Sequence, residues 1–201
     1  MIANDYNPSV LIGLTGVAGS GKTTAATLLV ESVPNVAEVR LSDPLKSMLE
    51  VLLNEYFGHP VDWNDREWKE APLFHVPGNP SPRKLAQTLG TDWGREIIHP
   101  NLWVEATSAE IRRQMALHQD VVVSDVRFDN EAKMIKDLGG YVIQIERDAA
   151  PSVEAHSSEN GVSLNLIDAV VYNNGEPEEM AESILLAIYQ LQNNKMEKLY
   201  S

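Results

Sequence analysis

The chain has 201 residues, of which 43% are hydrophobic, a content that predicts a fully packed core and excludes intrinsic disorder. Its formal net charge of -13 argues against electrostatic tracking along DNA or RNA, so no nucleic-acid partner is expected. With no cysteine in the sequence, disulfides, thiolate metal sites and cysteine nucleophiles are excluded. The start of the chain lacks a signal-peptide pattern, and no apolar run approaches the roughly 18 residues of a membrane span, so we expect a cytoplasmic protein with no membrane partner.

The N-terminal half is predicted to alternate strands with helices. Strands are expected at 10–14 and 38–41, and helices at 22–33, from 43 to about 56, at 83–98 and at 101–117. Asp43 is the predicted N-cap of its helix, with Pro44 at the first helical position. Residues 57–82 are rich in proline and are predicted to form a long loop with short helical pieces, a kind of segment that is often functional.

The C-terminal half continues the alternation. Strands are expected at 121–124, 141–146 and 169–172, and helices at 129–138 and from Pro177, while the polar tail from Gln192 is expected to fray. This order predicts one α/β domain over residues 1–201, with a central, mostly parallel sheet flanked by helices. The active site is then expected at the carboxyl ends of the strands.

Residues 16–23 match the phosphate-binding loop pattern Gly-x-x-x-x-Gly-Lys-Thr, in the required position between a strand and a helix. The glycines let backbone N–H groups converge on phosphate oxygens, and the helix N-terminus adds a favourable dipole. Lys22 is expected to reach the β- and γ-phosphates and Thr23 to bind Mg²⁺, so ATP and Mg²⁺ are the predicted donor and metal. The predicted ATP contacts in this loop are Gly16, Ala18, Gly19, Ser20, Gly21, Lys22, Thr23 and Thr24.

Asp125 follows an apolar strand, where a phosphate-loop protein places a second carboxylate that is associated with Mg²⁺. A helix cap or a solvated strand end is the alternative for this residue. Arg127 would lie near the transferred phosphate and neutralise its developing charge. Glu131 lies four residues after Arg127 and could hold that arginine or a ribose hydroxyl, with a plain surface ion pair as the alternative.

Residues 81–95 combine two arginines, a glutamine, a tryptophan and two glycines in a helical stretch. Glycines weaken a helix, which suggests a site rather than core. Arg83 and Arg95 suit a 5′-phosphate, because guanidinium groups bind phosphate bidentately. Gln87 and Trp93 could read and stack a base, with ordinary packing as the slightly favoured alternative for Trp93.

These motifs together resemble the bacteriophage deoxynucleoside monophosphate kinases, a phosphate-loop kinase family. The resemblance runs from about residue 10 to 176 and rests on the Gly-Ser-Gly-Lys loop and on a set of further motifs. Those motifs are Ser42-Asp43-Pro44-Leu45-Lys46, Pro82-Arg83-Lys84-Leu85-x-Gln87-x-x-Gly90-Thr91-Asp92-x-x-Arg95, Asn101-Leu102-Trp103, Ser124-Asp125-Val126-Arg127-Phe128-x-Asn130-Glu131 and His156-x-Ser158-Glu159.

The resemblance implies a nucleoside monophosphate kinase fold, with an acceptor-binding region at about 44–118 and a lid at about 147–163. It implies in-line transfer of the ATP γ-phosphate to a deoxynucleoside monophosphate, and it suggests a homodimer. For a phage-encoded protein, the expected cytoplasm is that of the host. Family roles extend to Lys22, Thr23, Arg83, Arg127 and Glu131. The whole acceptor-binding set is Asp43, Lys46, Arg83, Gln87, Trp93, Arg95, Arg127 and Glu131.

Three residues complete the predicted chemistry. Arg147, at the start of the lid, could touch the phosphates or adenine, and a closed lid would exclude water from ATP. Asp43 is the best carboxylate candidate near the acceptor, with the N-cap as its alternative role. Many relatives have an aspartate directly after the loop lysine where this chain has Thr23, so a role for that aspartate in activating the acceptor is not assumed here.

Two other functions compete with this interpretation. One is a phosphate-loop kinase of another phosphorylated small molecule, such as dephospho-coenzyme A or phosphomevalonate. The other is a nucleotide-dependent switch that binds a protein partner. The arginines of residues 83–95 favour a nucleotide acceptor, and the sequence leaves the identity of its base open.

Overall fold

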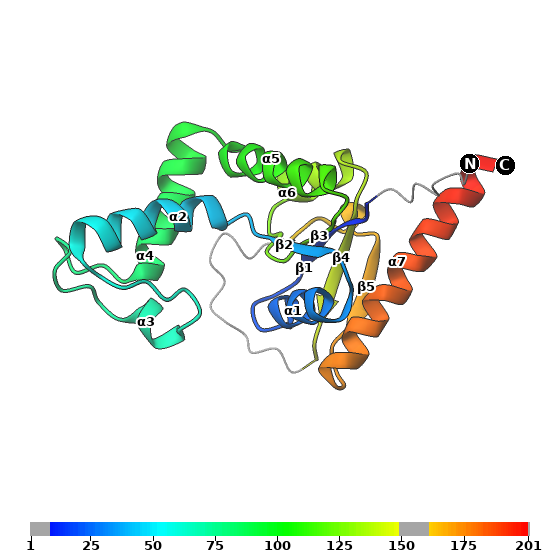
Figure 1. Cartoon of the computed structure of the whole chain (residues 1–201), viewed down its shortest axis with the longest axis horizontal. Coiled ribbons are helices and arrows are strands. Elements are labelled where there is room, and N and C mark those ends of the chain that lie inside the picture. The colour runs from blue at the N-terminus through cyan, green and yellow to red at the C-terminus, as the bar shows by residue number, and fades with distance from the viewer. Residues whose placement is uncertain (1–8, 149–160, 201) are drawn as a thin grey trace. The chain divides into compact units, whose positions relative to one another are not determined.

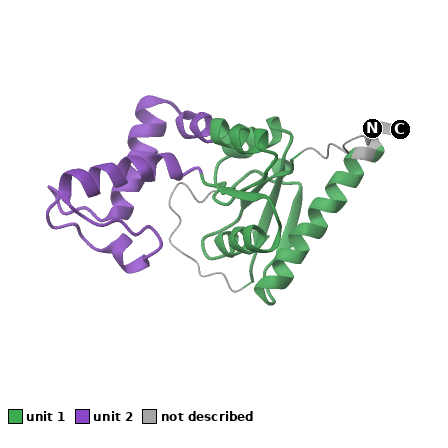
Figure 2. Cartoon of the chain, in the orientation of Figure 1, with its two compact units in different colours: residues 1–40, 108–201 green, residues 41–107 purple. Residues whose placement is uncertain are grey.

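The computed structural model describes residues 9–148 and 161–200, and the chain folds into two compact units. Unit 1 is built from residues 1–40 and 108–201, and unit 2 from residues 41–107 (Figure 2). Unit 2 covers much of the region 44–118 that the sequence assigns to the acceptor, and that assignment stays a prediction. Among the described residues, none of the helices has the length and apolarity that crossing a bilayer requires.

Unit 1 contains a five-stranded sheet in which every strand pair is parallel, as the alternating pattern predicted. The strand order is β2-β3-β1-β4-β5 (Figure 1). The strands are β1 (Leu11–Thr15), β2 (Val36–Val39), β3 (Asp120–Val123), β4 (Tyr141–Glu146) and β5 (Ala169–Tyr172).

Helices cover both faces of this sheet, so the central strands are buried on both sides, as parallel strands usually are. One face packs against α1 (Lys22–Ser32) and α7 (Pro177–Tyr200) through an apolar core. On the other face, α6 (Asp129–Asp137) packs closely on β1, because a Cβ at Gly13 would lie 3.0 Å from Val126 and 3.1 Å from Ile135. The helix α5 (Leu102–Ala116) runs across the sequence boundary between the units.

The strand register brings the carboxyl ends of three strands to one edge of the sheet. Gly13 of β1 is paired with Val123 of β3, and Thr15 of β1 is paired with Gln144 of β4. The segments that follow these strands therefore start side by side. They contain residues 16–23, the turn at 124–128 and Arg147, which is the edge where the sequence predicted the active site.

Unit 2 is helical, with α2 (Asp43–Val51), α3 (Arg66–Glu70) and α4 (Pro82–Gln87). Wider π-helical turns follow α2 at Leu52–Tyr56 and α4 at Thr88–Ile98. Two small apolar clusters hold the unit together, one around Leu45 and Trp103 and the other around Leu53 and Leu73. The short helix α3 confirms that the proline-rich loop carries a helical piece; the Asp65 side chain caps it by accepting from two backbone N–H groups.

Three details of the predicted elements are wrong. The strand β2 begins at Val36 rather than Glu38, because Asn35 takes a left-handed φ of 61° and turns the chain directly into the sheet. The N-cap of α2 is Ser42, and Asp43 is the first residue of the helix, where its charge suits the helix dipole. The tail from Gln192 is helical to Tyr200, and Lys195 Nζ lies over the Tyr141 ring, 6.0 Å from its centre.

The two glycines of residues 88–98 are core residues, which corrects the expectation that they mark a site. Gly90 and Gly94 are both buried, and the Trp103 indole Nε1 donates to the Gly90 carbonyl at 2.8 Å. A Cβ at Gly94 would lie 2.4 Å from that Nε1 atom. The absence of a side chain therefore lets the indole pack directly on the helix backbone.

Replacing Gly94 with alanine is expected to lower the free energy of unfolding by about 1–3 kcal/mol, because the added methyl group overpacks the indole. Gly90→Ala is the matched control, because a Cβ there meets only Leu45 at 3.2 Å, the far end of a flexible side chain. Urea unfolding of the two variants measures the difference. Equal stability of the two variants would contradict this packing role of Gly94.

Candidate active site

The phosphate-binding loop lies between β1 and α1, as predicted. Gly16, Gly19 and Gly21 have φ values of 138°, 79° and 108°, a region that favours glycine. A Cβ at Gly16 would lie 2.3 Å from the Ile145 carbonyl oxygen, so only glycine fits there. The loop therefore turns tightly over the end of the sheet and delivers the chain into the N-terminus of α1, whose first N–H groups lack helical partners and can bind an anion.

Lys22 folds back over this loop. Its Nζ atom donates to the carbonyl oxygens of Gly16 at 2.7 Å and Val17 at 2.8 Å. Thr23 and Thr24 follow in the first turn of α1, and both are exposed. The loop thus brings together a positive charge, two hydroxyl groups and a helix N-terminus, which suits the phosphates of a nucleotide.

A cavity of about 410 Å³ opens beside the loop, within the usual range of roughly 300–1,000 Å³ for small-ligand pockets. Its lining includes five predicted ATP contacts of the loop together with Arg147 from the end of β4. The predicted contacts Gly16, Ala18 and Ser20 do not line it, and the side chain of Ser20 is fully buried. The remaining lining residues are Asn173, Gly175, Pro177 and Met180.

Asp125 lies near the loop, two residues beyond the Val123–Gly13 pair of the sheet. The next residue, Val126, donates its backbone N–H to the Leu14 carbonyl at 3.2 Å, which draws the turn onto β1. Among the described residues, no group of three His, Asp or Glu side chains could hold a metal ion. Thr23 is exposed in the first turn of α1, and the assignment of Thr23 and Asp125 as Mg²⁺ ligands stays a prediction.

Glu131 accepts hydrogen bonds from the backbone of the turn that contains Arg127. Its side chain is 1% exposed, and its Oε2 atom accepts the N–H groups of Arg127 at 2.6 Å and Phe128 at 3.1 Å. The Arg127 side chain is exposed. Glu131 therefore holds the arginine through its main chain, and its burial contradicts the alternative of a surface ion pair. The predicted contact with a ribose hydroxyl stays a prediction.

Unit 2 contains six of the residues predicted for the acceptor. Arg83 and Gln87 lie one helical turn apart on α4 and are both exposed. Arg83 Nε donates to Glu70 Oε1 at 2.5 Å, an ion pair with both side chains about half exposed. Asp43 is in the first turn of α2. The α4 face is therefore the part of this unit where two predicted acceptor contacts come together.

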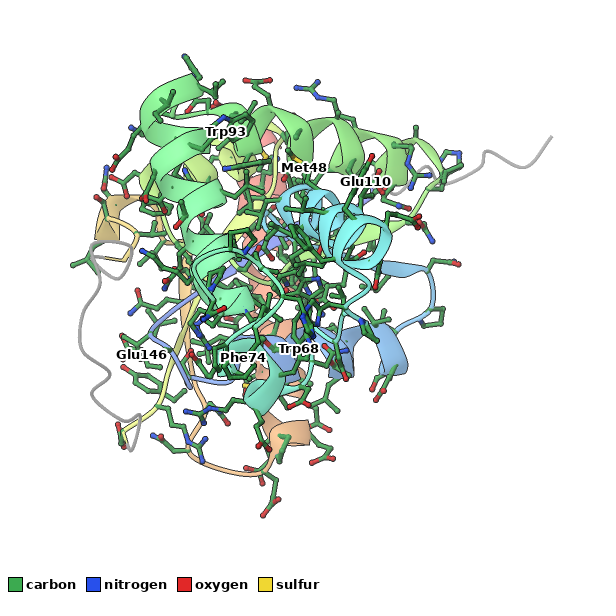
Figure 3. All side chains as sticks on the ribbon, turned by 90° about the vertical axis from the view of Figure 1, so that its left-hand side faces the viewer. Met48, Trp68, Phe74, Trp93, Glu110 and Glu146 are labelled. Carbon is green, nitrogen blue, oxygen red and sulfur yellow. The ribbon has the colours of Figure 1, made fainter. Side chains whose placement is uncertain are left out.

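The other predicted acceptor residues of unit 2 contact aromatic or backbone groups. Trp93, labelled in Figure 3, is 37% exposed. Its ring centre lies 6.2 Å from that of Trp103. This tryptophan thus packs on one side and is open on another. Lys46 lies over the Trp63 ring at 5.9 Å, and Arg95 donates to the Pro100 carbonyl at 3.4 Å.

The described residues on either side of 149–160 form hydrogen bonds with other residues of unit 1. Before this segment, Asp148 hydrogen-bonds with Asn174. After it, the Ser163 hydroxyl donates to Asp129 at 2.6 Å, and this bond is the main reason that the pKa of the Asp129 carboxyl lies below its usual value. Most of the predicted lid, including His156, lies outside the described residues.

Sequence reasoning missed two polar groups at the active edge. Asn173 follows β5 and reaches the phosphate loop, and an asparagine at the carboxyl end of a parallel strand was the available signal. Arg40 follows β2 and donates to both carboxylate oxygens of Glu38, at 2.8 and 2.7 Å. Glu38 also accepts the Ser124 hydroxyl at 2.5 Å, so this arginine is oriented beside the turn that contains Asp125.

The sequence matches the model of the deoxynucleotide monophosphate kinase family over residues 69–184, more than half of the chain. It is 37% identical to a candidate deoxynucleotide monophosphate kinase of Acanthamoeba polyphaga mimivirus, over 89% of this chain and 96% of that protein. It is 26% identical to the deoxynucleoside-5′-monophosphate kinase of Escherichia phage T5, over 64% of this chain and 72% of that protein.

Solved structures with a similar fold include shikimate kinase from Aquifex aeolicus, with a TM-score of 0.49, 17% identity and coverage of 92% of this chain and 98% of that one. Thymidylate kinase from Ehrlichia chaffeensis aligns with a TM-score of 0.47 and 17% identity, over 90% of this chain and 98% of that one.

Proposed function

The chain belongs to the deoxynucleotide monophosphate kinase family and phosphorylates deoxynucleoside monophosphates, and from that premise we propose which residues carry the reaction. The observation that supports the assignment most directly is the loop of residues 16–23, with Lys22 folded onto it beside a cavity of about 410 Å³. ATP is the proposed donor, and its phosphates would lie against the loop N–H groups and the N-terminus of α1.

In the proposed reaction, an oxygen of the acceptor phosphate attacks the γ-phosphorus in line. The bond between that phosphorus and the β,γ-bridging oxygen breaks, and ADP leaves. Lys22 would neutralise charge on the β- and γ-phosphates, and Thr23 and Asp125 would hold Mg²⁺. That ion would supply further neutralisation of the phosphate charge. Arg127, on the turn that Glu131 holds, would contact the transferred group.

The acceptor is proposed to bind unit 2. Arg83 and Gln87 share the exposed face of α4, so a phosphate and a base edge could be bound by one helix. Arg95, Lys46 and the exposed edge of Trp93 would complete this site. Asp43 is the carboxylate proposed to orient the acceptor.

The homodimer and the cytoplasmic location also belong to this proposal. The homodimer rests on the resemblance of the sequence motifs. Light scattering on the purified chain measures the oligomeric state, and a mass of about 22 kDa, that of one chain, would contradict the dimer.

A coupled assay of ADP release tests the proposed acceptor. The panel contains dAMP, dGMP, dCMP, dTMP, their ribose forms, dephospho-coenzyme A and phosphomevalonate, and kcat/KM is compared across it. We expect ADP release to require a deoxynucleoside monophosphate. Slow ATP hydrolysis that no member changes would favour a nucleotide switch, and stimulation by only one of the last two compounds would favour another small-molecule kinase.

A further inference from the structure

The turn that follows β5 lies against the phosphate-binding loop. Asn173 donates its backbone N–H to the Glu146 carbonyl at 2.7 Å, which extends the β4–β5 pairing by one residue. The turn Asn173-Asn174-Gly175 therefore starts at the active edge of the sheet, before α7 begins at Pro177. Both asparagines lie outside the set of site residues that the sequence predicted.

Asn173 is half-buried and its side chain reaches the loop across 153 positions of sequence. Its Nδ2 atom donates to the Ser20 carbonyl oxygen at 2.8 Å. A Cβ at Gly21 would lie 2.3 Å from the same Nδ2 atom, so the amide fits only because position 21 is a glycine. Close packing and a hydrogen bond thus occur at one point of the loop.

This hydrogen bond fixes the orientation of one peptide group. The Ser20 carbonyl and the Gly21 N–H belong to the same planar trans peptide and point in opposite directions. When Asn173 holds the carbonyl, the Gly21 N–H faces away from Asn173. Glycine rotates easily, so without this contact the peptide can turn its carbonyl to the side that a phosphate would occupy.

Asn174 hydrogen-bonds to Asp148, next to the part of the cavity wall that Arg147 forms. Its Oδ1 atom accepts the Asp148 backbone N–H at 3.0 Å, and its Nδ2 atom donates to Asp148 Oδ2 at 2.9 Å. Asp148 directly follows Arg147, which lines the cavity beside the loop. The paired hydrogen bonds therefore restrict the backbone that carries Arg147.

We propose that Asn173 and Asn174 are positioning residues for the donor nucleotide. Asn173 orients the Ser20–Gly21 peptide for phosphate, and Asn174 sets Arg147 at the mouth of the cavity. This inference rests on the proposed function, because it takes the cavity beside the loop as the ATP site. It predicts that changing these residues weakens the binding of ATP and leaves the binding of the deoxynucleoside monophosphate unchanged.

Equilibrium binding of a fluorescent ATP analogue and, separately, of the preferred deoxynucleoside monophosphate tests Asn173. We expect Asn173→Ala to raise the Kd of the ATP analogue about tenfold, which corresponds to the loss of one well-placed hydrogen bond. Asn173→Asp should raise it further, because it keeps the size, removes the donor and adds a negative charge. The Kd of the monophosphate should change less than about twofold.

Asn193→Ala is the matched control, an exposed asparagine on α7 outside the cavity. If Asn173→Ala is too unstable to assay, Asn173→Asp carries the test, because it keeps the volume of the side chain. Unchanged Kd values for the ATP analogue in a folded Asn173 variant would overturn the role of Asn173. An equal loss of affinity for donor and acceptor would also overturn it, since that points to general loosening of the fold.

A double-mutant cycle tests Asn174. If Asn174 acts through Arg147, Asn174→Ala should weaken ATP-analogue binding about threefold in the native background and have no effect in Arg147→Ala. Additive effects of the two changes would contradict that route. The monophosphate panel, run with the unaltered chain, distinguishes failure of the proposed function from failure of this inference. If no acceptor stimulates ADP release, the proposed function is refuted. If ADP release is normal but the Asn173 and Asn174 variants bind the ATP analogue normally, only this inference is refuted.

Discussion

Lys22→Ala is expected to lower kcat by about a thousandfold or more, in line with the loss of a positive charge that acts on the transferred phosphate. The Lys22 Nζ atom lies over the loop, 2.7 and 2.8 Å from two carbonyl oxygens, so its charge is already close to where the phosphates would bind. Steady-state kinetics with saturating ATP and acceptor measures the effect. Binding of the acceptor alone should stay unchanged, because Lys22 is proposed to bind the donor.

Lys195→Ala provides the matched control for that experiment. It removes the same kind of side chain from α7, about 15 residues and therefore roughly 22 Å along the helix from Met180 at the cavity. Its kcat should match that of the unaltered chain. Near-normal turnover in Lys22→Ala would remove the basis for assigning the chemistry to this loop.

Glu131→Ala is expected to lower both stability and activity. The change leaves two partly buried backbone N–H groups without the acceptor that the buried Glu131 provides, at about 1–3 kcal/mol for each. The free energy of unfolding should therefore fall by about 2–5 kcal/mol, and Tm by roughly 5–15 °C for a chain of this length. Because the turn then no longer fixes Arg127, kcat should also fall by about tenfold or more.

Glu131→Gln tests whether the hydrogen bonds to the backbone or the negative charge of the carboxylate is the property that matters. Both N–H groups bond to the same carboxylate oxygen, Oε2, so the single carbonyl oxygen of glutamine can accept both bonds. We expect this variant to keep most of the stability and of the activity. Thermal unfolding and kcat should be measured together; if Gln and Ala at this position cause the same losses, the backbone-capping role is wrong.

Much of the sheet and the phosphate loop could be predicted because their signals are local. Continuous β-branched residues at 121–123 are typical of a strand that is buried on both faces, and β3 is such a strand. The loop of residues 16–23 contains its glycines, lysine and threonine within eight consecutive positions. Parallel pairing then brings Asp125 to the same edge without further information.

For the residues that the sequence missed or misjudged, the role depends on a partner that is distant in sequence or on the direction of the side chain. A glycine in a helix fits a ligand site or close packing equally well, and only the Trp103 indole shows that Gly94 serves packing. Glu131 has the spacing of a surface ion pair, whereas its side chain turns inward to the backbone N–H groups. The position of Asn173 after a strand indicates the edge of the sheet, but its hydrogen bond to Ser20, 153 positions away, has no local signal.

The most direct test of the account follows the phosphate itself. ATP labelled in its γ-phosphate is incubated with the purified chain, Mg²⁺ and the preferred deoxynucleoside monophosphate, and the products are separated. We expect the label to appear in the deoxynucleoside diphosphate, in equal amount to the ADP formed, and we expect Lys22→Ala to abolish this transfer. Label that appears only as inorganic phosphate, with no deoxynucleoside diphosphate, would contradict it.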